Sequence, residues 1–225
     1  MTVEVTALPM HSRLGRHREH DSRSRLHNVA ARLETRAIRP VLWPRISPIF
    51  DQGALGSCTG MAMAGWLGSA PHCPDGGMYR ENEARWIYAL GTRVDAFPGF
   101  WPPTDTGSSG LGVARAARDL GMIKGWSTAF TTTAMLQALM ISPVLIGTVW
   151  TEGMFDPDVA GEVRPTGAVA GGHEYLCRGL DAESRLICDN SWGTSWGPLD
   201  GSFLLTLPSW EILRSQQADV VVPYL

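Results

Sequence analysis

The hydrophobic pattern of the 225-residue chain changes in character along its length. Residues 58–69 contain no charged side chain and many small ones, which predicts a helix that packs closely on every side and begins at Cys58. Residues 80–90 and 111–121 place apolar positions on one face, as amphipathic helices do, and we expect a further short helix at 133–140. The first part of the chain is therefore predicted to be mainly helical.

Beyond residue 140 the pattern favours strands. ISPVLIGTVW (141–150) is an apolar, β-branched run, and GSFLLTL (201–207) and ADVVVPYL (218–225) predict two more strands. EYLCRGL (174–180) and SRLICDN (184–190) flank a short polar turn and predict an antiparallel hairpin. Helices early and strands late indicate an α+β fold, with a helical lobe at about 50–125 and a β lobe at about 126–225.

The register of the predicted hairpin brings polar side chains together. A hairpin centred on its turn places Cys177 opposite Cys188 and His173 opposite Trp192. Alternation puts these side chains on one face, with Asn190 as the diagonal neighbour of His173 and within reach of its imidazole. We expect Cys177 and Cys188 to be free core thiols, and a cross-strand disulfide is the alternative.

Charge is distributed unevenly. Residues 1–45 hold nine Arg and four acidic groups, for a net charge of +5, whereas the remainder carries −8. Prolines at positions 40, 44 and 48 predict an extended path for the end of this basic N-terminal arm. The arm lacks interleaved aromatic residues and any recognisable nucleic-acid-binding motif. We therefore expect it to pack against its own acidic body rather than to bind nucleic acid.

The composition excludes several classes of protein. No apolar run approaches the roughly 20 residues that a membrane span needs, so no membrane association is expected. The first 30 residues lack the uninterrupted apolar core of a secretory signal. Four cysteines are too few for a disulfide scaffold. These features predict a soluble, intracellular globular protein.

The candidate chemistry centres on Cys58. At the start of a helix, unpaired backbone N–H groups and the helix dipole favour a thiolate. Gln52 lies six residues upstream, where its amide could donate a hydrogen bond beside the N–H of Cys58 and form an oxyanion hole. A cysteine nucleophile needs a base. Four of the six histidines lie in the arm and His72 is expected at the surface, which leaves His173, at the start of a predicted strand.

Three stretches resemble the active-site signatures of papain-like cysteine peptidases, namely DQGALGSCTG, GGHEY and NSWGTSWG. The three stretches occur in the family's order, and the resemblance spans about residues 45–225. The resemblance implies a two-lobed fold with the active site in the cleft between the lobes. It makes Cys58 the nucleophile, His173 the base, Asn190 the residue that orients the imidazole and Gln52 part of the oxyanion hole. Peptide bonds would be hydrolysed through a thioester acyl-enzyme, with no metal or cofactor.

The same resemblance suggests where a polypeptide substrate would bind. The DTGSSG loop falls where the family has a glycine-rich strip along the substrate backbone, so Gly107, Ser108 and Ser109 are candidate substrate-binding residues. Gly172, just before His173, permits close approach of another backbone. Trp192 lies in the third signature and is expected to shield the contact between His173 and its asparagine from water.

Two departures from the family pattern change the expectations. Leu55 replaces the cysteine three residues before the nucleophile, so the familiar neighbouring disulfide cannot form, which fits a reducing compartment such as the cytoplasm. We expect no long helical inhibitory prosegment, because only about 45 residues precede the peptidase-like region. Two alternatives remain open: a lysin that cuts peptidoglycan cross-bridges, for which no wall-binding module is seen, and a catalytically silent binding protein, although no triad member is missing.

Overall fold

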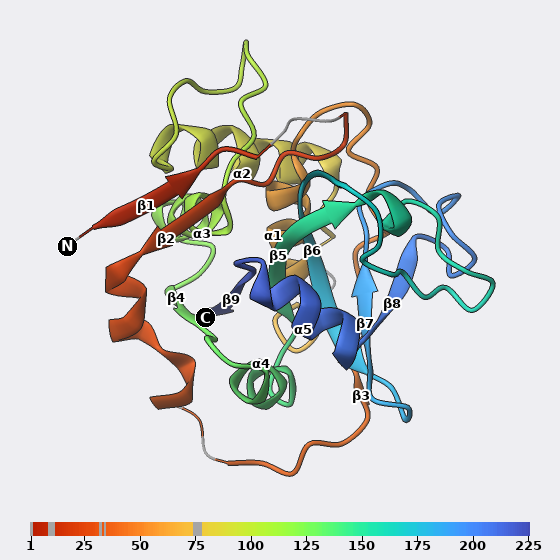
Figure 1. Cartoon of the computed structure of the whole chain (residues 1–225). Helices are drawn as coiled ribbons and strands as arrows, with labels where there is room; N and C mark the ends of the chain where they lie inside the picture. The colour runs from red at the N-terminus through yellow and green to blue at the C-terminus, as the bar shows by residue number, and fades with distance from the viewer. Residues whose placement is uncertain (1, 9–11, 32, 34, 74–77) are drawn as a thin grey trace.

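The computed structural model describes residues 2–8, 12–31, 33, 35–73 and 78–225. Within these residues a seven-stranded antiparallel sheet forms the centre, in the order β4-β9-β5-β6-β7-β8, with β3 paired to β6 (Figure 1). Its strands are β3 (Val41–Leu42), β4 (Gly125–Thr128), β5 (Val144–Thr151), β6 (Val169–Leu180), β7 (Arg185–Asp189), β8 (Ser202–Thr206) and β9 (Asp219–Tyr224).

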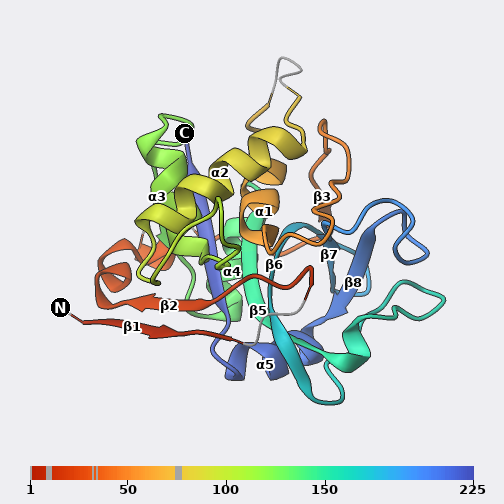
Figure 2. The same cartoon turned by 90° about the horizontal axis from the view of Figure 1, so that it is seen from above.

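Helices cover both faces of this sheet (Figures 1 and 2). They are α1 (Cys58–Leu67), α2 (Glu81–Val94), α3 (Gly110–Asp119), α4 (Thr132–Leu139) and α5 (Leu207–Ser215), with a short 3₁₀ helix η3 (Glu152–Met154) after β5. The first three pack on one face, and α4 and α5 pack on the other. In the part of the chain that the structure describes, no helix is long and apolar enough to cross a membrane.

Two groups of buried apolar side chains follow from this layering. One group joins α1–α3 to Leu145, Leu176 and Val221 of the sheet. The other joins α4 and α5 to side chains on the opposite face of the same strands, including Ile146 and Tyr175. The alternation of side chains along each strand therefore divides the interior between the two faces. The α+β fold class is confirmed, whereas the division into two lobes stays a prediction, since both groups share the sheet.

The sequence predicted the elements that carry strong patterns. The helix at Cys58 begins at that residue and is buried along its whole length. The helix expected at 80–90 extends to Val94. The short strand β4 and the helix α5 were not foreseen. Strand β4 depends on pairing with the distant β9, and α5 is a nine-residue helix that starts directly at the end of β8.

The hairpin of β6 and β7 has the predicted register beside the candidate site. Leu176 pairs with Asp189, and Cys177 pairs with Cys188. A bulge between Cys177 and Gly179 shifts the pairing only on the side of the turn. Cys177 and Cys188 are buried and unbridged, as expected. Because the bulge lies away from the site, it leaves His173 and Asn190 as diagonal neighbours.

The N-terminal arm is more structured than the expected extended chain. Strands β1 (Val3–Thr6) and β2 (Arg18–Asp21) pair antiparallel, and the 3₁₀ helices η1 (Ser22–His27) and η2 (Val29–Ala31) follow. Asp21 caps η1 by accepting the backbone N–H of Arg23, which is why the strand ends there. The arm packs against the body through ion pairs, to which it contributes Arg16, Arg45 and the carboxylate of Glu19.

One of these ion pairs fixes the end of the arm next to the candidate site. Asp189, at the end of β7, accepts hydrogen bonds from Arg45 at 2.7 Å and from Arg178 and Ser202 at 2.8 Å. Burial raises the pKa of Asp189, but the charges and hydrogen bonds of Arg45 and Arg178 outweigh it, and the net shift is downward from 3.8. Asp189 therefore stabilises the fold above its ordinary pKa, and this contribution is lost as the pH falls below that value.

We expect Asp189→Asn to lower the free energy of unfolding at pH 7 by about 3–5 kcal/mol, because it removes the buried counter-charge of two partly buried guanidinium groups. The difference from wild type should shrink below about pH 4. Thermal unfolding at both pH values measures it. Asp119→Asn is the matched control, because it breaks only an exposed pair with Arg118. Equal melting temperatures for the two variants at pH 7 would contradict this role for Asp189.

Candidate active site

Cys58 is the first residue of α1 and is completely buried. The helix lies tightly against α2, since a Cβ at Gly60 would collide with the backbone of Ala84 and with Tyr88. Burial raises the pKa of the Cys58 thiol to about 12, although the backbone N–H groups of Glu174, Gly15 and Thr59 act in the opposite direction. Two of these N–H groups come from distant parts of the chain, from β6 and from the arm.

His173 on β6 is held by the residue that the sequence predicted. Its Nε2 lies 2.7 Å from Oδ1 of Asn190, which also accepts the backbone N–H of Ser191 at 2.8 Å. Because that oxygen is an acceptor, Nε2 carries the proton and Nδ1 is the basic nitrogen. Nδ1 has no hydrogen-bond partner within the described residues. The hydrogen bond from Cys58 to His173 that the triad requires is therefore not made in this state.

Aromatic rings enclose the imidazole. The ring of Trp192 lies 5.0 Å from that of His173, and the ring of Trp150 lies 4.9 Å away with its edge toward it. Burial lowers the pKa of His173 to about 4, against the effect of the hydrogen bond to Asn190. With the pKa of Cys58 raised and that of His173 lowered, the pair consists of a neutral thiol and a neutral imidazole near pH 7. Trp192 and Trp150 thus both lie against the buried imidazole.

Gln52 lies beside Ser191, the residue that follows Asn190. Its backbone N–H donates to Ser191 at 2.9 Å, and its Oε1 accepts the Ser191 hydroxyl at 2.6 Å. Its Nε2 donates to the carbonyl of Leu55 at 2.6 Å. An amide nitrogen carries two hydrogens, so this bond leaves one for another acceptor. The loop that leads to Cys58 is thus tied to the residues that follow β7.

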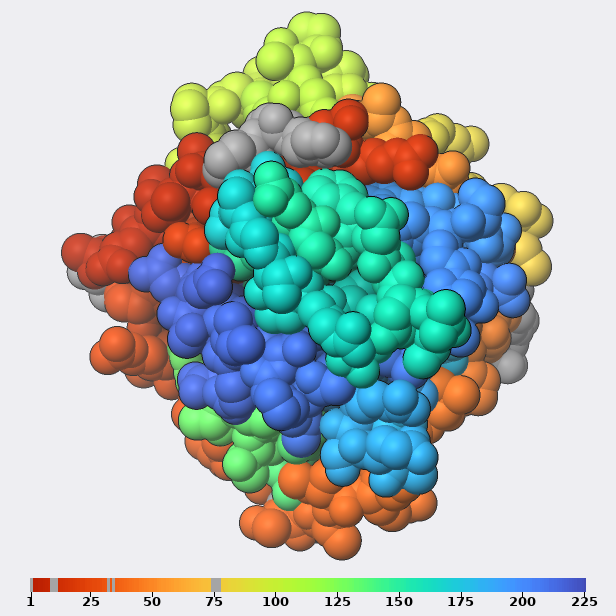
Figure 3. Space-filling view, turned by 45° about the vertical axis from the view of Figure 1, so that its right-hand side comes forward, coloured from red at the N-terminus to blue at the C-terminus, as the bar shows by residue number. Residues whose placement is uncertain are grey.

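The N-terminal arm crosses the site between the helices and β6 (Figure 2). Arg16 donates its backbone N–H to the carbonyl of Gly172 at 3.0 Å. Ser108 bonds on both sides of Arg16: its N–H donates to Gly15 at 2.8 Å, and its carbonyl accepts from His17 at 2.7 Å. This is a parallel bridge between Arg16 and Ser108. In Figure 3 part of the red arm lies between the teal segment and the orange and yellow-green segments.

The arm contacts every residue predicted to bind substrate. Besides Ser108 and Gly172, Ser109 donates its hydroxyl to Glu19 at 2.5 Å, and Trp192 donates its indole N–H to the carbonyl of Arg13 at 3.4 Å. Gly107 has a left-handed φ of 67°, and a Cβ there would lie 2.5 Å from the carbonyl oxygen of Gly15. An extended polypeptide, the arm itself, therefore occupies the whole strip.

Sequence reasoning missed two carboxylates, the buried Glu174 and the partly buried Asp219, and the arm residue between them. Glu174 and Asp219 face the side chain of Arg16, which is completely buried. A signal was present, since Glu174 is a charged residue directly after His173, at the start of the predicted strand 174–180. The opposite charges of arm and body were a second signal, but they did not indicate which residues would meet.

Asn190 is expected to matter through His173. Asn190→Ala removes the acceptor of Nε2, which is a net loss of about 1–1.5 kcal/mol. If that bond orients the base during reaction, the rate should fall about tenfold. Peptide cleavage, compared with the exposed helix variant Asn82→Ala, measures the change. A rate equal to that of the control would show that Asn190 does not position the imidazole.

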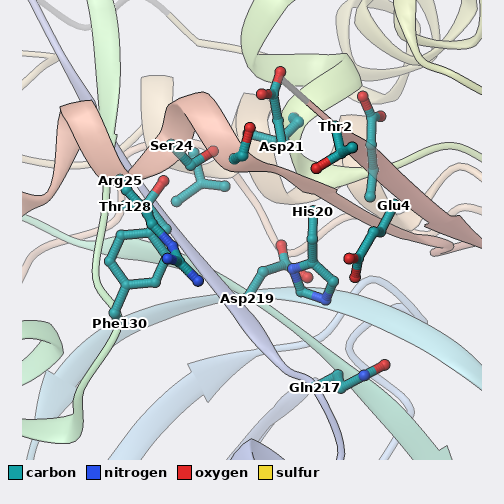
Figure 4. Close-up of a pocket in the computed structure, with 14 residues that line it drawn as sticks. Thr2, Glu4, His20, Asp21, Ser24, Arg25, Thr128, Phe130, Gln217 and Asp219 are labelled. Atoms are coloured by element: carbon teal, nitrogen blue, oxygen red, sulfur yellow. The ribbon is translucent and has the colours of Figure 1, made fainter.

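A separate cavity of about 480 Å³ lies under the arm and does not include Cys58 or His173. Figure 4 shows it between the arm residues Glu4 and His20 and the body residues Thr128, Phe130 and Asp219. Across the described ranges, no three His, Cys, Asp or Glu side chains gather in a way that could hold a metal ion.

The fold is papain-like. Solved structures with similar architecture include xylellain, a cysteine protease from Xylella fastidiosa, with a TM-score of 0.68, 18% identity, and coverage of 95% of this chain and 97% of that one. The bromelain protease from Ananas comosus gives a TM-score of 0.58 with 14% identity and coverage of 79% and 93%. Digestive procathepsin L 3 from Tenebrio molitor gives 0.52 with 17% identity and coverage of 85% and 72%. No protein-family model and no curated protein matches the sequence.

Proposed function

We propose that this chain is a cysteine peptidase whose N-terminal arm covers its own active site. The observation that carries the proposal is the path of the arm. An extended polypeptide runs past Cys58, bonded through its backbone to Ser108 and Gly172, while His173 and Asn190 form a hydrogen-bonded pair beside it. Backbone bonding of this kind accepts many sequences, as a peptidase site must. The solved structures with the same fold, which are cysteine proteases, support the same function.

The proposed reaction uses only groups of the chain and water. Nδ1 of His173 takes the proton of the Cys58 thiol, and Sγ attacks the peptide carbonyl to form a tetrahedral intermediate. The N–H of Cys58 and an Nε2 hydrogen of Gln52 stabilise its oxyanion. The carbon–nitrogen bond breaks, the amine leaves with the proton from His173, and a thioester remains. Water, deprotonated by His173, hydrolyses the thioester and restores the thiol.

The arm keeps this machinery inactive in two ways. The backbone N–H of Gly15 is hydrogen-bonded to the Cys58 thiol, and a Cβ at Gly15 would overlap the backbone of Gly56, so a substrate cannot enter while the arm is in place. Burial under the arm also favours the neutral thiol and imidazole over the reactive ion pair. Displacing the arm admits water, which lowers the pKa of the thiol and raises that of His173. The arm is thus proposed to act as a reversible cover.

A peptide-library digest tests the function. The full-length chain carries Gly15→Val, which places a side chain against Gly56 and pushes the arm off the site. Products are identified by mass spectrometry, with the wild-type chain as the covered control. We expect internal cleavage of peptides by the variant and little by wild type. If Cys58 becomes reactive to iodoacetamide in the variant and no peptide is cut, the peptidase proposal is wrong, and a peptidoglycan cross-bridge hydrolase or a silent binding protein takes its place.

We also propose a reducing compartment such as the cytoplasm. Leu55 stands where the papain-like pattern has a structural cysteine, so the disulfide of that pattern near the site cannot form, and Cys177 and Cys188 face each other unbridged. Thiol titration of the native and unfolded protein after isolation without reductant tests this. Four titratable thiols in the unfolded chain are expected, and two would contradict it.

A further inference from the structure

The side chain of Arg16 occupies a closed acidic pocket next to the nucleophile. Gly15 lies over Cys58, so Arg16 is one residue further along the same extended backbone. Its guanidinium forms an ion pair with Asp219 and lies 3.4 Å from the carbonyl of Gln217. It is completely buried, whereas Asp219 is slightly exposed at the edge. The arm therefore presents an arginine to a pocket that belongs to the body.

A second carboxylate closes the pocket from the other side. Glu174, next to His173 on β6, is buried, and neither of its carboxylate oxygens has a hydrogen-bond partner within the described residues. The Nε and Nη1 of Arg16 are likewise buried without a hydrogen-bond partner. A Cβ added at Gly147 would lie 2.5 Å from Oε2 of Glu174 and 2.7 Å from Nε of Arg16. Both unpaired groups therefore lie next to the same position on β5 and face each other. The guanidinium thus lies between two carboxylates.

Two glycines make room for this arrangement. A Cβ at Gly147 would lie 2.8 Å from Asp219, and a Cβ at Gly110 would lie 2.7 Å from Glu174 and 2.9 Å from Asp219. Neither glycine has a left-handed φ, so backbone conformation does not demand glycine at these positions. Their lack of a side chain instead provides the volume that a long side chain and two carboxylates need. When the arm leaves, the carboxyl groups of Glu174 and Asp219 remain in a narrow pocket without a cation.

We propose that this pocket, formed by Glu174, Asp219, Gly110 and Gly147, selects substrates with a basic side chain, and arginine above all. In the arm, Gly15 lies at Cys58 and the adjacent residue, Arg16, enters the pocket. In a substrate, the residue that enters the pocket would likewise be adjacent to the residue whose carbonyl carbon Cys58 attacks. Arginine suits the pocket since its planar guanidinium can bond two carboxylates at once. The proposal rests on the proposed peptidase function. Arg16 of the arm then occupies the pocket in the same way as the arginine of a substrate would.

The first test is substrate preference. The full-length Gly15→Val chain digests a peptide library, and the residues flanking each cut are counted. Arginine is expected to be enriched at the residue next to the one attacked, with kcat/KM about 30-fold or more above that of the matched leucine peptide. In Asp219→Asn this ratio should fall at least tenfold, while the exposed Asp119→Asn keeps it. Cleavage without any preference for basic residues would overturn the pocket proposal and leave the peptidase function intact.

The second test does not depend on cleavage. A synthetic peptide of residues 12–21, SRLGRHREHD, is added to the Gly15→Val chain, and the rate of Cys58 alkylation by iodoacetamide is measured. The peptide should protect Cys58 at concentrations about 30-fold lower than its Arg16→Ala version, whereas the Arg13→Ala version, which loses the same charge at an exposed position, should protect like the parent. If no library peptide is cut, this difference still supports an arginine pocket. Equal protection by the parent and Arg16→Ala peptides would overturn it.

Discussion

Replacing Cys58 with alanine should reduce peptide cleavage by the arm-displaced chain at least a thousandfold. The expected loss is this large because the thiol forms the covalent bond of the intermediate, and His173, Asn190 and Gln52 act only through it. Removing a nucleophile that works as a unit with its base costs nearly all of the rate enhancement. The measurement is kcat/KM for one library peptide, in the Gly15→Val background so that the wild-type activity is measurable.

The control for this loss removes a thiol elsewhere. Cys73 lies outside the site, after α1, and Cys73→Ala in the same background should keep most of the activity. Melting temperatures show whether either variant has lost its fold. Cleavage that survives in a folded Cys58→Ala chain would show that another group performs the reaction and would remove the basis of the mechanism.

Gly15→Val should increase the alkylation rate of Cys58 and the rate of peptide cleavage by about 5- to 150-fold. A valine side chain at this position meets the backbone of Gly56, which cannot move aside as a flexible side chain would. Overpacking of this kind costs roughly 1–3 kcal/mol, which shifts the balance between covered and open arm by that factor. The backbone of Gly15 is not left-handed, so valine adds no conformational strain of its own.

The pH dependence of labelling separates the two states. In the covered chain the pKa of Cys58 is about 12 and that of His173 about 4, so iodoacetamide labelling of wild type should be slow across neutral pH. In Gly15→Val the exposed pair should form thiolate and imidazolium, and labelling should persist well below pH 7. Thr6→Val, an exposed β-branched change in β1 of the same arm, is the control and should behave like wild type. Identical profiles for Gly15→Val and Thr6→Val would show that the arm does not control the thiol.

The arrangement of the catalytic groups could be predicted because it depends on short-range patterns. Cys58 begins a helix whose small residues predict close packing. His173 and Asn190 lie on one hairpin, and the position of its turn determines the pairing of its strands. Once the register is set, the diagonal contact follows from the spacing of paired strands. The one irregularity, a bulge after Cys177, happens to fall on the far side from the site. Gln52 could be placed near the site, but its bonds to Ser191 and Leu55 could not be foreseen.

The path of the arm could not be predicted. Its weak periodicity indicated neither the β1–β2 hairpin nor the strip from Arg13 to His17 that crosses the site. The bonds that hold this strip join residues about 90 to 200 positions apart, such as His17 to Ser108 and Arg16 to Asp219. Charge asymmetry predicted that the arm packs on the body, yet net charge carries no information about which arginine enters which pocket.

The sequence by itself thus determined the α+β class, the helix that begins at Cys58 and the neighbouring pair His173 and Asn190. All three follow from periodicity and turn geometry, which act over short stretches of chain. Only the tertiary structure decided that the arm covers the nucleophile, that the Cys58 thiol and His173 are both neutral beneath it, and that Arg16 lies between Glu174 and Asp219. Burial and ion pairing depend on which distant segments contact each other in space, and the pattern of hydrophobic and polar residues along the chain does not specify those contacts.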